Sequence, residues 1–586
     1  MEKIYSINGP VVTVYGAKCF QMMEMVYVGA LRLIGEVIMI SDEKTTIQVY
    51  EDTSGLKVGE PVEGTGGPIC ALLGPGILTN IFDGIERPLR ELEKQSGAFI
   101  AKGIACEALD VTKKWDVTIW VQTGDQVRPG EIFATTQETS LILHKSMIPP
   151  DIEGTVVWAA ANGAYTVTEP ILKVEGKDGT IHDVALAQRW PIKTARPIRE
   201  RLAVDQPLLT GQRVIDTMFP IGKGGAAAIP GGFGTGKTMT QHQIAKWSDA
   251  DIIIYIGCGE RGNEMTQVLE EFGELIDPKS GKPLTDRTSL IANTSNMPVA
   301  AREASIYTGI TLAEYYRDMG YHVAIMADST SRWAEALREI SGRLEEMPAE
   351  EGFPAYLPSR LSQFYERAGF AETLSGNKGS VTIIGAVSPQ GGDFSEPVTQ
   401  NTKRFIRCFW ALDRSLAYSR HYPAIHWVNS YTEYLDDLTP WYAENVRADF
   451  MEVRGKILGI LLEENHLLEI VKLIGKDVLP EDQKLSLETA ALIREGFLQQ
   501  NAYHDIDTYV PIEKQYRMME TILYLHECAL PLVRKNIPVS MLTELGLFEK
   551  LSRMKYDVAN DDADAFDAYK REIDDATRKL LSEYEG

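Results

Sequence analysis

One eight-residue segment limits what this chain can fold into more than any other feature. Residues 231–238 read Gly-Gly-Phe-Gly-Thr-Gly-Lys-Thr and match the pattern G-x-x-x-x-G-K-S/T in full. Glycine makes up 49 of 586 residues, so a chain of this composition should hold only about 0.02 accidental matches. The apolar run 226–229 precedes the segment and a helix-competent stretch, 239–247, follows it. We therefore predict a strand, a phosphate-binding loop and a helix, in that order.

In this motif, each residue type has a known role in binding a nucleotide phosphate or its metal ion. Glycines let backbone N–H groups turn inward and surround phosphate oxygens, and the next helix adds its positive N-terminal end. Lys237 would reach the β- and γ-phosphates, and the hydroxyl of Thr238 would ligate Mg²⁺. We therefore expect Mg²⁺ with ATP or ADP as the ligand. The candidate nucleotide-binding residues of this segment are Gly231, Gly232, Phe233, Gly234, Thr235, Gly236, Lys237, Thr238 and Met239.

A strand-end aspartate is the candidate metal partner of this loop. Asp328 ends the apolar run 321–327, and open α/β sheets place ligand groups at the carboxyl ends of their strands. Such an aspartate can also be a simple helix cap. In a chain with a phosphate-binding loop, we interpret Asp328 as the acid that holds the metal shell.

A second acid, Glu260, is the candidate catalytic carboxylate. It follows the segment 251–256 through Gly257, Cys258 and Gly259, and Gly259 and Gly262 flank it. We predict that these glycines keep Glu260 on a tight loop rather than in a helix. There its carboxylate could orient or deprotonate a water for attack on the γ-phosphate. The alternative is a surface glutamate that pairs with Arg261.

Apolar runs and amphipathic stretches alternate between about residues 200 and 430. The runs 252–256, 323–326 and 381–387 are almost continuously apolar, which is typical of parallel strands covered on both faces. The segments 265–272 and 331–340 have helical periodicity between them. This region is therefore predicted to be an α/β domain.

The regions on either side of the α/β domain show different sequence patterns. Short β-rich runs with frequent glycine and proline turns predict a small β-barrel at the N-terminus and a β-sandwich inserted before the α/β domain. After about residue 440 the helical period dominates, and the acidic last thirty residues are interpreted as a solvated helix face. The predicted boundaries are 1–70 for the barrel, 71–109 for a connecting segment, 110–190 for the insertion, 191–435 for the α/β domain and 436–586 for a helical domain.

Composition excludes several classes of protein. The net charge of −24 argues against general nucleic-acid binding, and hence against a ring helicase that moves on RNA. The 6 cysteines form no C-x-x-C pair, which argues against a disulfide scaffold and a zinc ribbon. The sequence contains neither a long uncharged apolar run nor a signal-peptide pattern. We expect a soluble, cytoplasmic, multidomain protein.

Three further residues have a functional and an ordinary interpretation. Tyr422 precedes Pro423, and Tyr503 follows Ala502. Either ring could cover adenine, but on sequence alone both are ordinary tyrosines. Lys145 could carry biotin or lipoate on a hairpin, although its neighbours do not make the usual carrier turn. We therefore treat the insertion as structural.

Several longer motifs together resemble one family. Residues 257–265 read Gly-Cys-Gly-Glu-Arg-Gly-Asn-Glu-Met. The segments 294–298, 327–339 and 388–393 read Thr-Ser-Asn-Met-Pro, Ala-Asp-Ser-Thr-Ser-Arg-Trp-Ala-Glu-Ala-Leu-Arg-Glu and Ser-Pro-Gln-Gly-Gly-Asp. With the loop 231–238, they resemble the catalytic A subunits of the V/A-type rotary ATPases and ATP synthases over essentially the full length. The resemblance implies an N-terminal β-barrel, an inserted β-rich bulge domain, a RecA-like P-loop nucleotide-binding domain and a C-terminal α-helical domain.

The resemblance also implies roles for individual residues. Lys237 and Thr238 match the phosphate and Mg²⁺ residues, and Asp328 matches the Walker B aspartate. Glu260 matches the catalytic glutamate, and Arg261 matches its phosphate-contacting neighbour. Tyr422 and Tyr503 match the aromatic positions that flank adenine, where some relatives carry Phe.

Two positions in the loop depart from the family pattern. Gly232 replaces the usual proline, which removes a constraint on φ. Thr235 stands where eukaryotic relatives often carry a redox-sensitive cysteine, which argues against a disulfide switch and favours a bacterial or archaeal type of enzyme.

The family context implies partners and a location. A subunits alternate with B subunits in an A3B3 ring, which central and peripheral stalks connect to a membrane sector that carries H⁺ or Na⁺. The chain would then be a peripheral protein on the cytoplasmic side of the membrane, with an arginine finger supplied by B. Two rivals are a flagellar or type III export ATPase and a non-catalytic nucleotide-binding member of the ring. The first lacks the insertion, and the second usually lacks the loop lysine or the catalytic glutamate.

Overall fold

The computed structural model describes residues 2–16, 19–97 and 100–585 of the chain. They form two compact units, and each is described by itself. The first unit comprises Met1–Ala203, Lys223–Ala228 and Ala250–Ile406, and the second comprises Val204–Gly222, Ile229–Asp249 and Arg407–Gly586.

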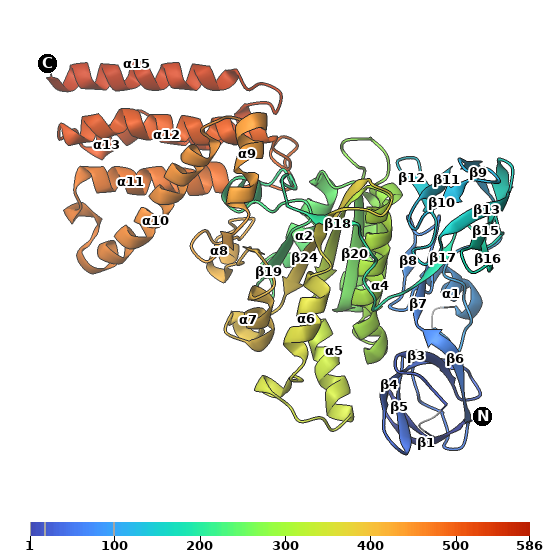
Figure 1. The fold of residues 1–586 in the computed structure, drawn as a ribbon. Coiled ribbons are helices and arrows are strands. Elements are labelled where there is room, and N and C mark those ends of the chain that lie inside the picture. The colour runs from blue at the N-terminus through green and yellow to red at the C-terminus, as the bar shows by residue number, and fades with distance from the viewer. Residues whose placement is uncertain (1, 17–18, 98–99, 586) are drawn as a thin grey trace. The chain divides into compact units, whose positions relative to one another are not determined.

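Six strands at the N-terminus form the predicted barrel (Figure 1). These strands are β1 (Glu2–Asn8), β2 (Val11–Tyr15), β3 (Glu24–Val28), β4 (Leu33–Ile40), β5 (Lys44–Val49) and β6 (Pro61–Pro68). Val12, Val14 and Val26 alternate along their strands with more exposed residues and are fully buried in the barrel core. Pairing of β1 with β6 closes the sheet, which removes its free edges.

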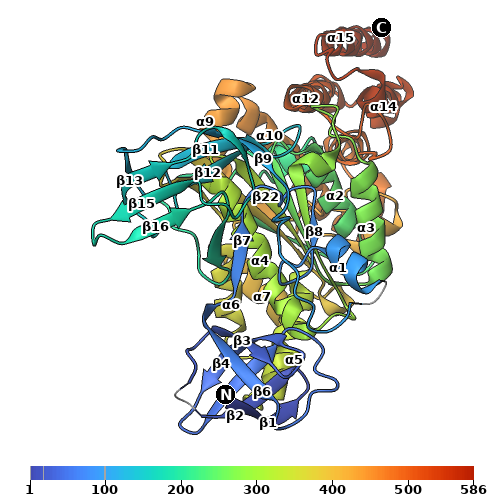
Figure 2. The same cartoon turned by 90° about the vertical axis from the view of Figure 1, so that its right-hand side faces the viewer.

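The inserted region forms two four-stranded antiparallel sheets, with the orders β10-β13-β15-β16 and β12-β11-β9-β14 (Figure 2). Their strands are β9 (Trp115–Ile119), β10 (Gln126–Val127), β11 (Ile132–Gln137), β12 (Leu143–Met147), β13 (Gly154–Ala159), β14 (Gly163–Tyr165), β15 (Leu172–Gly176) and β16 (Ile181–Val184). Lys145 lies within β12, and its ammonium donates to the carbonyl of Met319 at 3.0 Å. This lysine therefore makes a structural contact rather than standing on a carrier hairpin.

A short connecting region joins the barrel to the rest of the first unit. It contains β7 (Cys70–Leu73), β8 (Ile81–Phe82) and α1 (Leu89–Ser96). After the insertion, β17 (Gln188–Pro191) returns and pairs with β7. β8 joins the edge of the central sheet by pairing with β21.

The core of the first unit is a parallel sheet with the strand order β24-β22-β20-β21-β8. The strands of the central region are β18 (Glu200–Leu202), β19 (Ala226–Pro230), β20 (Ile252–Glu260), β21 (Thr288–Thr294), β22 (His322–Asp328), β23 (Gly369–Glu372) and β24 (Lys378–Val387). The helices of this unit's core are α3 (Gly262–Glu274), α4 (Val299–Asp318), α5 (Thr330–Arg343), α6 (Leu357–Tyr365) and α7 (Pro397–Lys403). The predicted parallel strands 252–256, 323–326 and 381–387 are confirmed as parts of β20, β22 and β24.

Helix α4 is an element that the periodicity did not predict. It packs against β20 and β22, and nearly all of its side chains are buried, including Arg302, Glu314 and Arg317. A helix that is covered on all sides has no polar stripe, so its sequence lacks the amphipathic signal.

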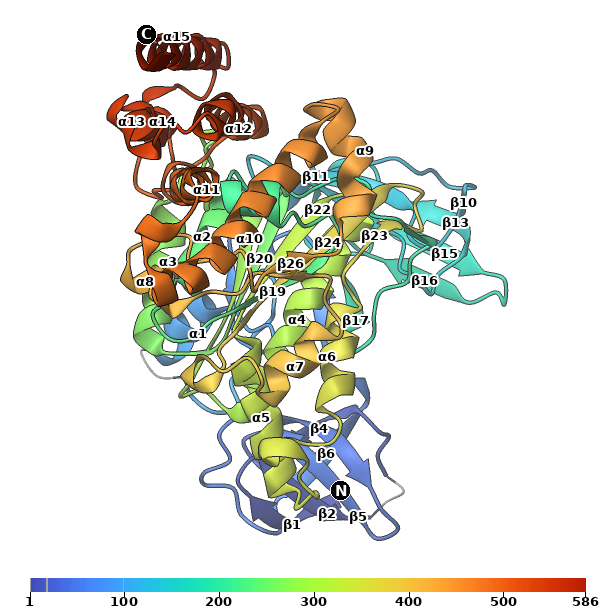
Figure 3. The same cartoon turned by 90° about the vertical axis from the view of Figure 1, so that its left-hand side faces the viewer.

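The second unit is mainly helical (Figure 3). Its helices are α2 (Lys237–Trp247), α8 (Arg414–Tyr418), α9 (Leu435–Asn445), α10 (Phe450–Ile474), α11 (Glu481–Leu492), α12 (Ile512–Arg534), α13 (Val539–Glu544), α14 (Leu547–Asp557) and α15 (Ala565–Glu585), and β25 (Cys408–Phe409) pairs with β26 (Tyr431–Thr432). Leu485, Leu532 and Leu580 join α11, α12 and α15 in one apolar core. The predicted fold class of barrel, β-rich insertion, α/β domain and helical domain is thus confirmed.

Candidate active site

The predicted phosphate-binding loop connects β19 to α2, which begins at Lys237. Gly234 and Gly236 have φ angles of +76° and +90°, a region that residues with a Cβ rarely adopt. A Cβ on Gly231 would lie 2.5 Å from Oγ1 of Thr235. The backbone of this turn therefore requires glycine at these positions, as the motif predicts.

Lys237 lies against the loop that it follows. Its ammonium donates to the carbonyls of Gly231 and Gly232 at 2.7 and 3.1 Å. Oγ1 of Thr235 donates to the same Gly232 carbonyl at 2.8 Å. Thr238 is half-buried in the first turn of α2. The loop thus carries a positive charge and a helix N-terminus, the two features that favour phosphate.

A cavity of about 530 Å³ adjoins the loop within the second unit. Gly236 and Met239 line it from the loop side, and Tyr422 and Tyr503 line it from the C-terminal side. A Cβ on Gly236 would lie 3.4 Å from Cε1 of Tyr422, so the loop and this ring are immediate neighbours. The structure therefore brings the two predicted tyrosines to the loop. Phe233, at the tip of the loop, is 81% exposed.

The rings of this cavity offer accessible faces. Tyr503 is 84% exposed and Tyr422 is 42% exposed. Gln212, Gln243 and Asn501 add amide groups to the lining. Flat aromatic surfaces with a few amide donors and acceptors suit a planar heteroaromatic base.

A buried ion pair, which the sequence did not single out, supports the segment that carries Tyr503. The side chains of Arg213 and Asp507 are fully buried and pair at 2.5 Å. The Arg213 guanidinium also donates to the carbonyl of Gln499 at 2.7 Å, and Oδ2 of Asp507 accepts the backbone N–H of Asn501 at 2.7 Å. These residues carry no motif, so only their contact in the fold reveals the pair.

Glu260 and Asp328 end two neighbouring parallel strands of the first unit. Glu260 is the last residue of β20 and Asp328 is the last residue of β22. Gly257 of β20 is the register partner of Asp328. Both acids therefore lie at the carboxyl edge of the sheet, where their positions after apolar runs predict them.

The backbone at Glu260 differs from the expected loop. β20 continues through Glu260, and its pairing with β21 shifts register between Cys258 and Glu260. Gly259 has φ of +74° at this shift. A glycine in the left-handed region takes up the extra residue of a bulge, so pairing resumes at Glu260 opposite Thr294. Gly259 thus bends a strand, and Gly262 begins α3, so Glu260 does not lie on the predicted loop.

The surroundings of Glu260 favour its protonated form. Burial and the negative charges of Asp328 and Glu264 raise the pKa of Glu260 to about 8, while Arg332 opposes this rise. A carboxylate with a pKa near neutrality can accept a proton from water within the ordinary working range of pH. This is the electrostatic property that a general base requires.

Asp328 is buried and receives a hydrogen bond from a tyrosine. The hydroxyl of Tyr255 donates to Oδ2 of Asp328 at 3.3 Å, and Asp328 is 3% exposed. Burial, followed by the charges of Asp328 and Glu260, raises the pKa of Tyr255 far above its usual range, so the phenol keeps its proton and remains a donor.

The two predicted metal ligands, Thr238 and Asp328, both offer oxygen atoms, which Mg²⁺ prefers. Within the described residues, no cluster of three or more His, Cys, Asp and Glu side chains is placed to hold a metal. Thr238 of the second unit carries a hydroxyl, and Asp328 of the first unit carries a carboxylate. Mg²⁺ commonly takes one or two protein oxygens and completes its shell with phosphates and water, so each residue by itself has the chemistry of a Mg²⁺ ligand.

Arg261 lies next to the candidate catalytic glutamate. It immediately precedes α3, its side chain is 62% exposed, and its guanidinium lies 3.8 Å from Glu264. An exposed arginine is available to an anionic ligand at modest desolvation cost.

Family models match each part of the chain. The nucleotide-binding domain of the ATP synthase alpha/beta family matches residues 211–432, and the β-barrel domain of the same family matches 4–66. The alpha/beta subunit barrel-sandwich domain matches 106–193, and the C-terminal domain of V and A type ATP synthase matches 439–542.

Named relatives resemble the chain over its full length. V-type ATP synthase alpha chain 2 of Clostridium tetani is 59% identical over 581 residues, which cover 99% of this chain and 98% of the relative. The chain belongs to the ATP synthase family that comprises the alpha chains of the V-type enzymes and the A subunits of the A-type enzymes. The V-type ATP synthase alpha chain of Halothermothrix orenii is 57% identical over 584 residues, which cover 100% of this chain and 99% of the relative. The corresponding A chain of the A-type ATP synthase of Methanopyrus kandleri is 55% identical over 584 residues, which cover 99% of this chain and 98% of the relative. The family that the motifs resemble is thus confirmed.

A solved export ATPase shares the fold. The assembled ATPase EscN of the enteropathogenic E. coli type III secretion system matches with a TM-score of 0.64 and 20% sequence identity, covering 89% of this chain and 100% of that chain. At this identity the likeness concerns fold alone. None of the helices in the described part of the chain combines the length and apolar character that crossing a bilayer requires.

Proposed function

We propose that this chain is the catalytic subunit of a V/A-type, ion-translocating rotary ATPase or ATP synthase. It hydrolyses ATP to ADP and phosphate to drive rotation and the transport of H⁺ or Na⁺. In reverse, it makes ATP from ADP and phosphate at the expense of the ion gradient. The observation that carries this proposal is a complete phosphate-binding loop beside a cavity lined by two tyrosines, in a chain that belongs to the ATP synthase family.

The second unit would bind the nucleotide. Backbone N–H groups of residues 231–239 would surround the phosphates, and Lys237 would contact the β- and γ-phosphates. Tyr422 and Tyr503 would flank the adenine ring. The close approach of the Tyr422 ring to Gly236 supports this role, because both residues line one cavity and the base pocket therefore adjoins the phosphate loop.

The first unit would supply the acid–base group. Glu260 would orient a water and accept its proton while the water oxygen attacks the γ-phosphorus. The bond from the γ-phosphorus to the bridging oxygen breaks, and ADP leaves with that oxygen. Arg261 would contact the phosphate while negative charge moves from the γ-phosphoryl group to the oxygen that leaves with ADP. The raised pKa of Glu260 supports its role as proton acceptor.

Magnesium would be the metal cofactor. Thr238 and Asp328 would hold it, and when bound it would neutralise charge on the β- and γ-phosphate oxygens. Tyr255 would keep the Asp328 carboxylate oriented by its hydrogen bond.

The proposed assembly is an alternating A3B3 ring on central and peripheral stalks, connected to a membrane sector that moves the ion. The chain would lie at the cytoplasmic side of the membrane as a peripheral component. An arginine finger from B would stabilise the transition state, and such residues contribute about 10³–10⁵ in rate in other phosphoryl-transfer enzymes. The isolated chain should therefore hydrolyse ATP only slowly.

A substitution at Glu260 tests this proposal. In the assembled A–B ring, Glu260→Gln should lower ATP turnover by at least about 10²-fold, because the amide cannot accept the proton of the attacking water. Glu274→Gln, an exposed position at the end of α3, is the matched control and should retain normal turnover. Near-normal hydrolysis by the Glu260 variant would remove this residue from its role.

A further inference from the structure

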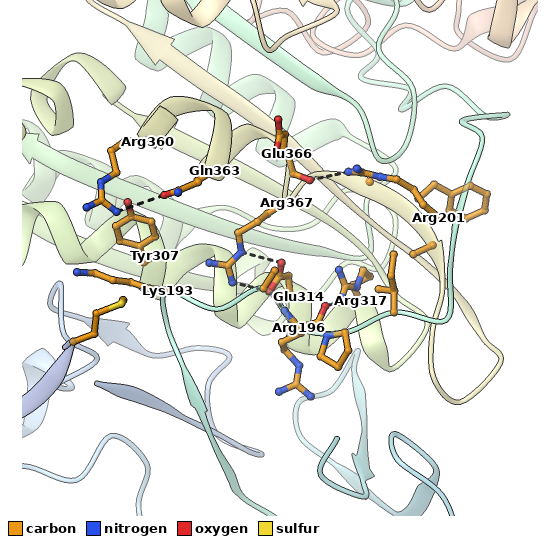
Figure 4. A pocket seen from close by; sticks show the side chains of 17 residues that line it. Lys193, Arg196, Arg201, Tyr307, Glu314, Arg317, Arg360, Gln363, Glu366 and Arg367 are labelled. Carbon is orange, nitrogen blue, oxygen red and sulfur yellow. Dashed lines mark hydrogen bonds and ion pairs between the residues drawn. The ribbon is translucent and has the colours of Figure 1, made fainter. Parts of the chain in front are cut away.

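A cavity of about 650 Å³ in the first unit has a lining rich in arginine (Figure 4). It is formed by the connector that follows β17, by α4, and by the segment from α6 to β23. Its basic lining residues are Lys193, Arg196, Arg201, Arg317, Arg360 and Arg367. Its acidic lining residues are Glu314 and Glu366. No residue of the proposed catalytic site lines this cavity.

Neighbouring carboxylates neutralise part of this positive charge. Arg367 and Glu314 form a two-point ion pair, with distances of 2.9 and 2.6 Å. Arg196 and Arg317 share the single carboxylate of Asp318, at 2.6 and 2.7 Å. Lys193 lies 2.5 Å from Glu36 of the barrel and 3.9 Å from Glu303.

Two arginines of the lining, Arg201 and Arg360, form no ion pair with a carboxylate in the described part of the chain. Arg201 donates to the backbone carbonyls of Glu366, at 2.8 Å, and Ala368. Arg360 donates to the side-chain oxygen of Gln363 at 3.5 Å. Arg201 is thus contacted by carbonyl groups alone, whereas Arg360 also interacts with the hydroxyl of Tyr307 and with the more distant negative charge of Glu303.

Arg196 contributes a buried guanidinium to the wall of the cavity. Arg196 is 4% exposed, and its Nη1 is buried without a hydrogen-bond partner. Its other nitrogens donate to Asp318 at 2.6 Å and to Gln188 at 3.3 Å. The same guanidinium lies over the rings of Trp190 and Tyr315, 5.0 and 5.4 Å from their centroids, so Arg196 is a fixed, protein-covered part of the cavity wall.

We propose that this cavity binds a small phosphorylated anion at a site separate from the catalytic nucleotide. Guanidinium groups match phosphate oxygens in charge and in two-point geometry, which makes arginine the usual residue for phosphate recognition. The volume falls within the range of about 300–1,000 Å³ typical of small-molecule sites. Tyr307 and Phe370 give the lining an apolar part that can cover the rest of such a molecule.

Binding of inorganic pyrophosphate to the full-length chain tests the proposal. The titration is followed by calorimetry with saturating ADP, so that the phosphate-binding loop is already occupied. We expect pyrophosphate to bind in the presence of ADP. Arg201→Gln and Arg360→Gln should each weaken this binding about tenfold or more, because each removes a charge-assisted hydrogen bond.

Arg199→Gln is the matched control. Arg199 lies on the same connector, its side chain is 66% exposed, and it pairs with Glu372 at 2.8 Å outside the cavity lining. This variant should bind pyrophosphate like the wild-type chain. Thermal unfolding of all three variants shows whether each is folded, and Arg360→Lys, which keeps the charge, should retain part of the affinity.

Three outcomes overturn the proposal. The first is the absence of pyrophosphate binding in the presence of ADP at millimolar concentration. The second is unchanged binding by the doubly substituted chain, Arg201→Gln with Arg360→Gln. The third is loss of the ADP-insensitive binding in Lys237→Ala, which would assign the pyrophosphate to the phosphate-binding loop instead.

Discussion

Asp328 acts on Glu260 across two neighbouring strand ends. It is the register partner of Gly257 on β20, the strand that ends at Glu260. After burial, the charge of Asp328 is the largest cause that raises the pKa of Glu260, from its usual value of 4.5 to about 8. In the metal-free chain, the acid proposed to hold the metal thus raises the proton affinity of the neighbouring carboxylate.

The raised pKa of Glu260 has a consequence for stability. Protonated Glu260 favours the folded state, so its contribution is fully present below about pH 4.5 and is lost as pH rises through about 8. In the Glu260→Gln variant the side chain at position 260 cannot ionise. The free energy of unfolding of this variant should therefore fall less between pH 5 and pH 9 than that of the wild-type chain. The difference should be on the order of a few kcal/mol at most. Thermal unfolding midpoints at these pH values measure it, and a wild-type-minus-variant difference that stays constant with pH would contradict the assignment.

Lys237→Ala should abolish tight nucleotide binding. The ammonium beside the Gly231 and Gly232 carbonyls is the charge that would meet the β- and γ-phosphates. We expect ADP affinity to fall by about 10²-fold or more, measured by calorimetry on the purified chain. Lys246→Ala, in the last turn of the same helix, should bind ADP normally. Micromolar ATP binding by the Lys237 variant would argue against the phosphate cradle.

Tyr503→Ala should weaken ADP binding by about 2- to 12-fold, since an aromatic contact contributes about 0.5–1.5 kcal/mol. Tyr503→Phe keeps the ring and should retain most of the affinity. Tyr418, on α8 in the same unit, is 78% exposed and does not line the cavity, so Tyr418→Ala serves as the control. Equal affinity of the Tyr503 alanine and phenylalanine variants would exclude stacking.

Removal of either member of the Arg213–Asp507 pair should destabilise the second unit. Arg213→Gln or Asp507→Asn leaves an uncompensated buried charge, at a cost of about 3–5 kcal/mol. The double variant should be less destabilised than the sum of the single ones, because the charge left behind is also removed. Urea denaturation measures these differences.

Arg447→Gln is the control for these stability measurements. It breaks a half-exposed ion pair with Glu513 and should lower the free energy of unfolding by less than about 1 kcal/mol. The single variants at Arg213 and Asp507 should also lower ADP affinity, because the pair supports the segment that carries Tyr503. Additive effects on stability, or an intact nucleotide site in both single variants, would count against this support.

The sequence predicted the parts of the molecule that local pattern controls. The glycine spacing of 231–238 reflects positive φ angles at Gly234 and Gly236, and such angles depend on the residue itself. The apolar runs of β20, β22 and β24 reflect burial on both faces of a parallel sheet. α4 was missed for the same reason, because complete burial erases the periodic contrast that identifies a helix.

Contacts between distant segments were decided only by the tertiary structure. The pair Arg213–Asp507 joins positions 294 residues apart, and no local pattern records it. The bulge at Gly259, the raised pKa of Glu260 and the arginine-rich lining of the first unit's cavity likewise depend on which strands and helices meet. A sequence determines backbone preference and periodic burial by short-range sterics and hydrophobicity. Electrostatic energies depend on the distances and desolvation that packing alone creates.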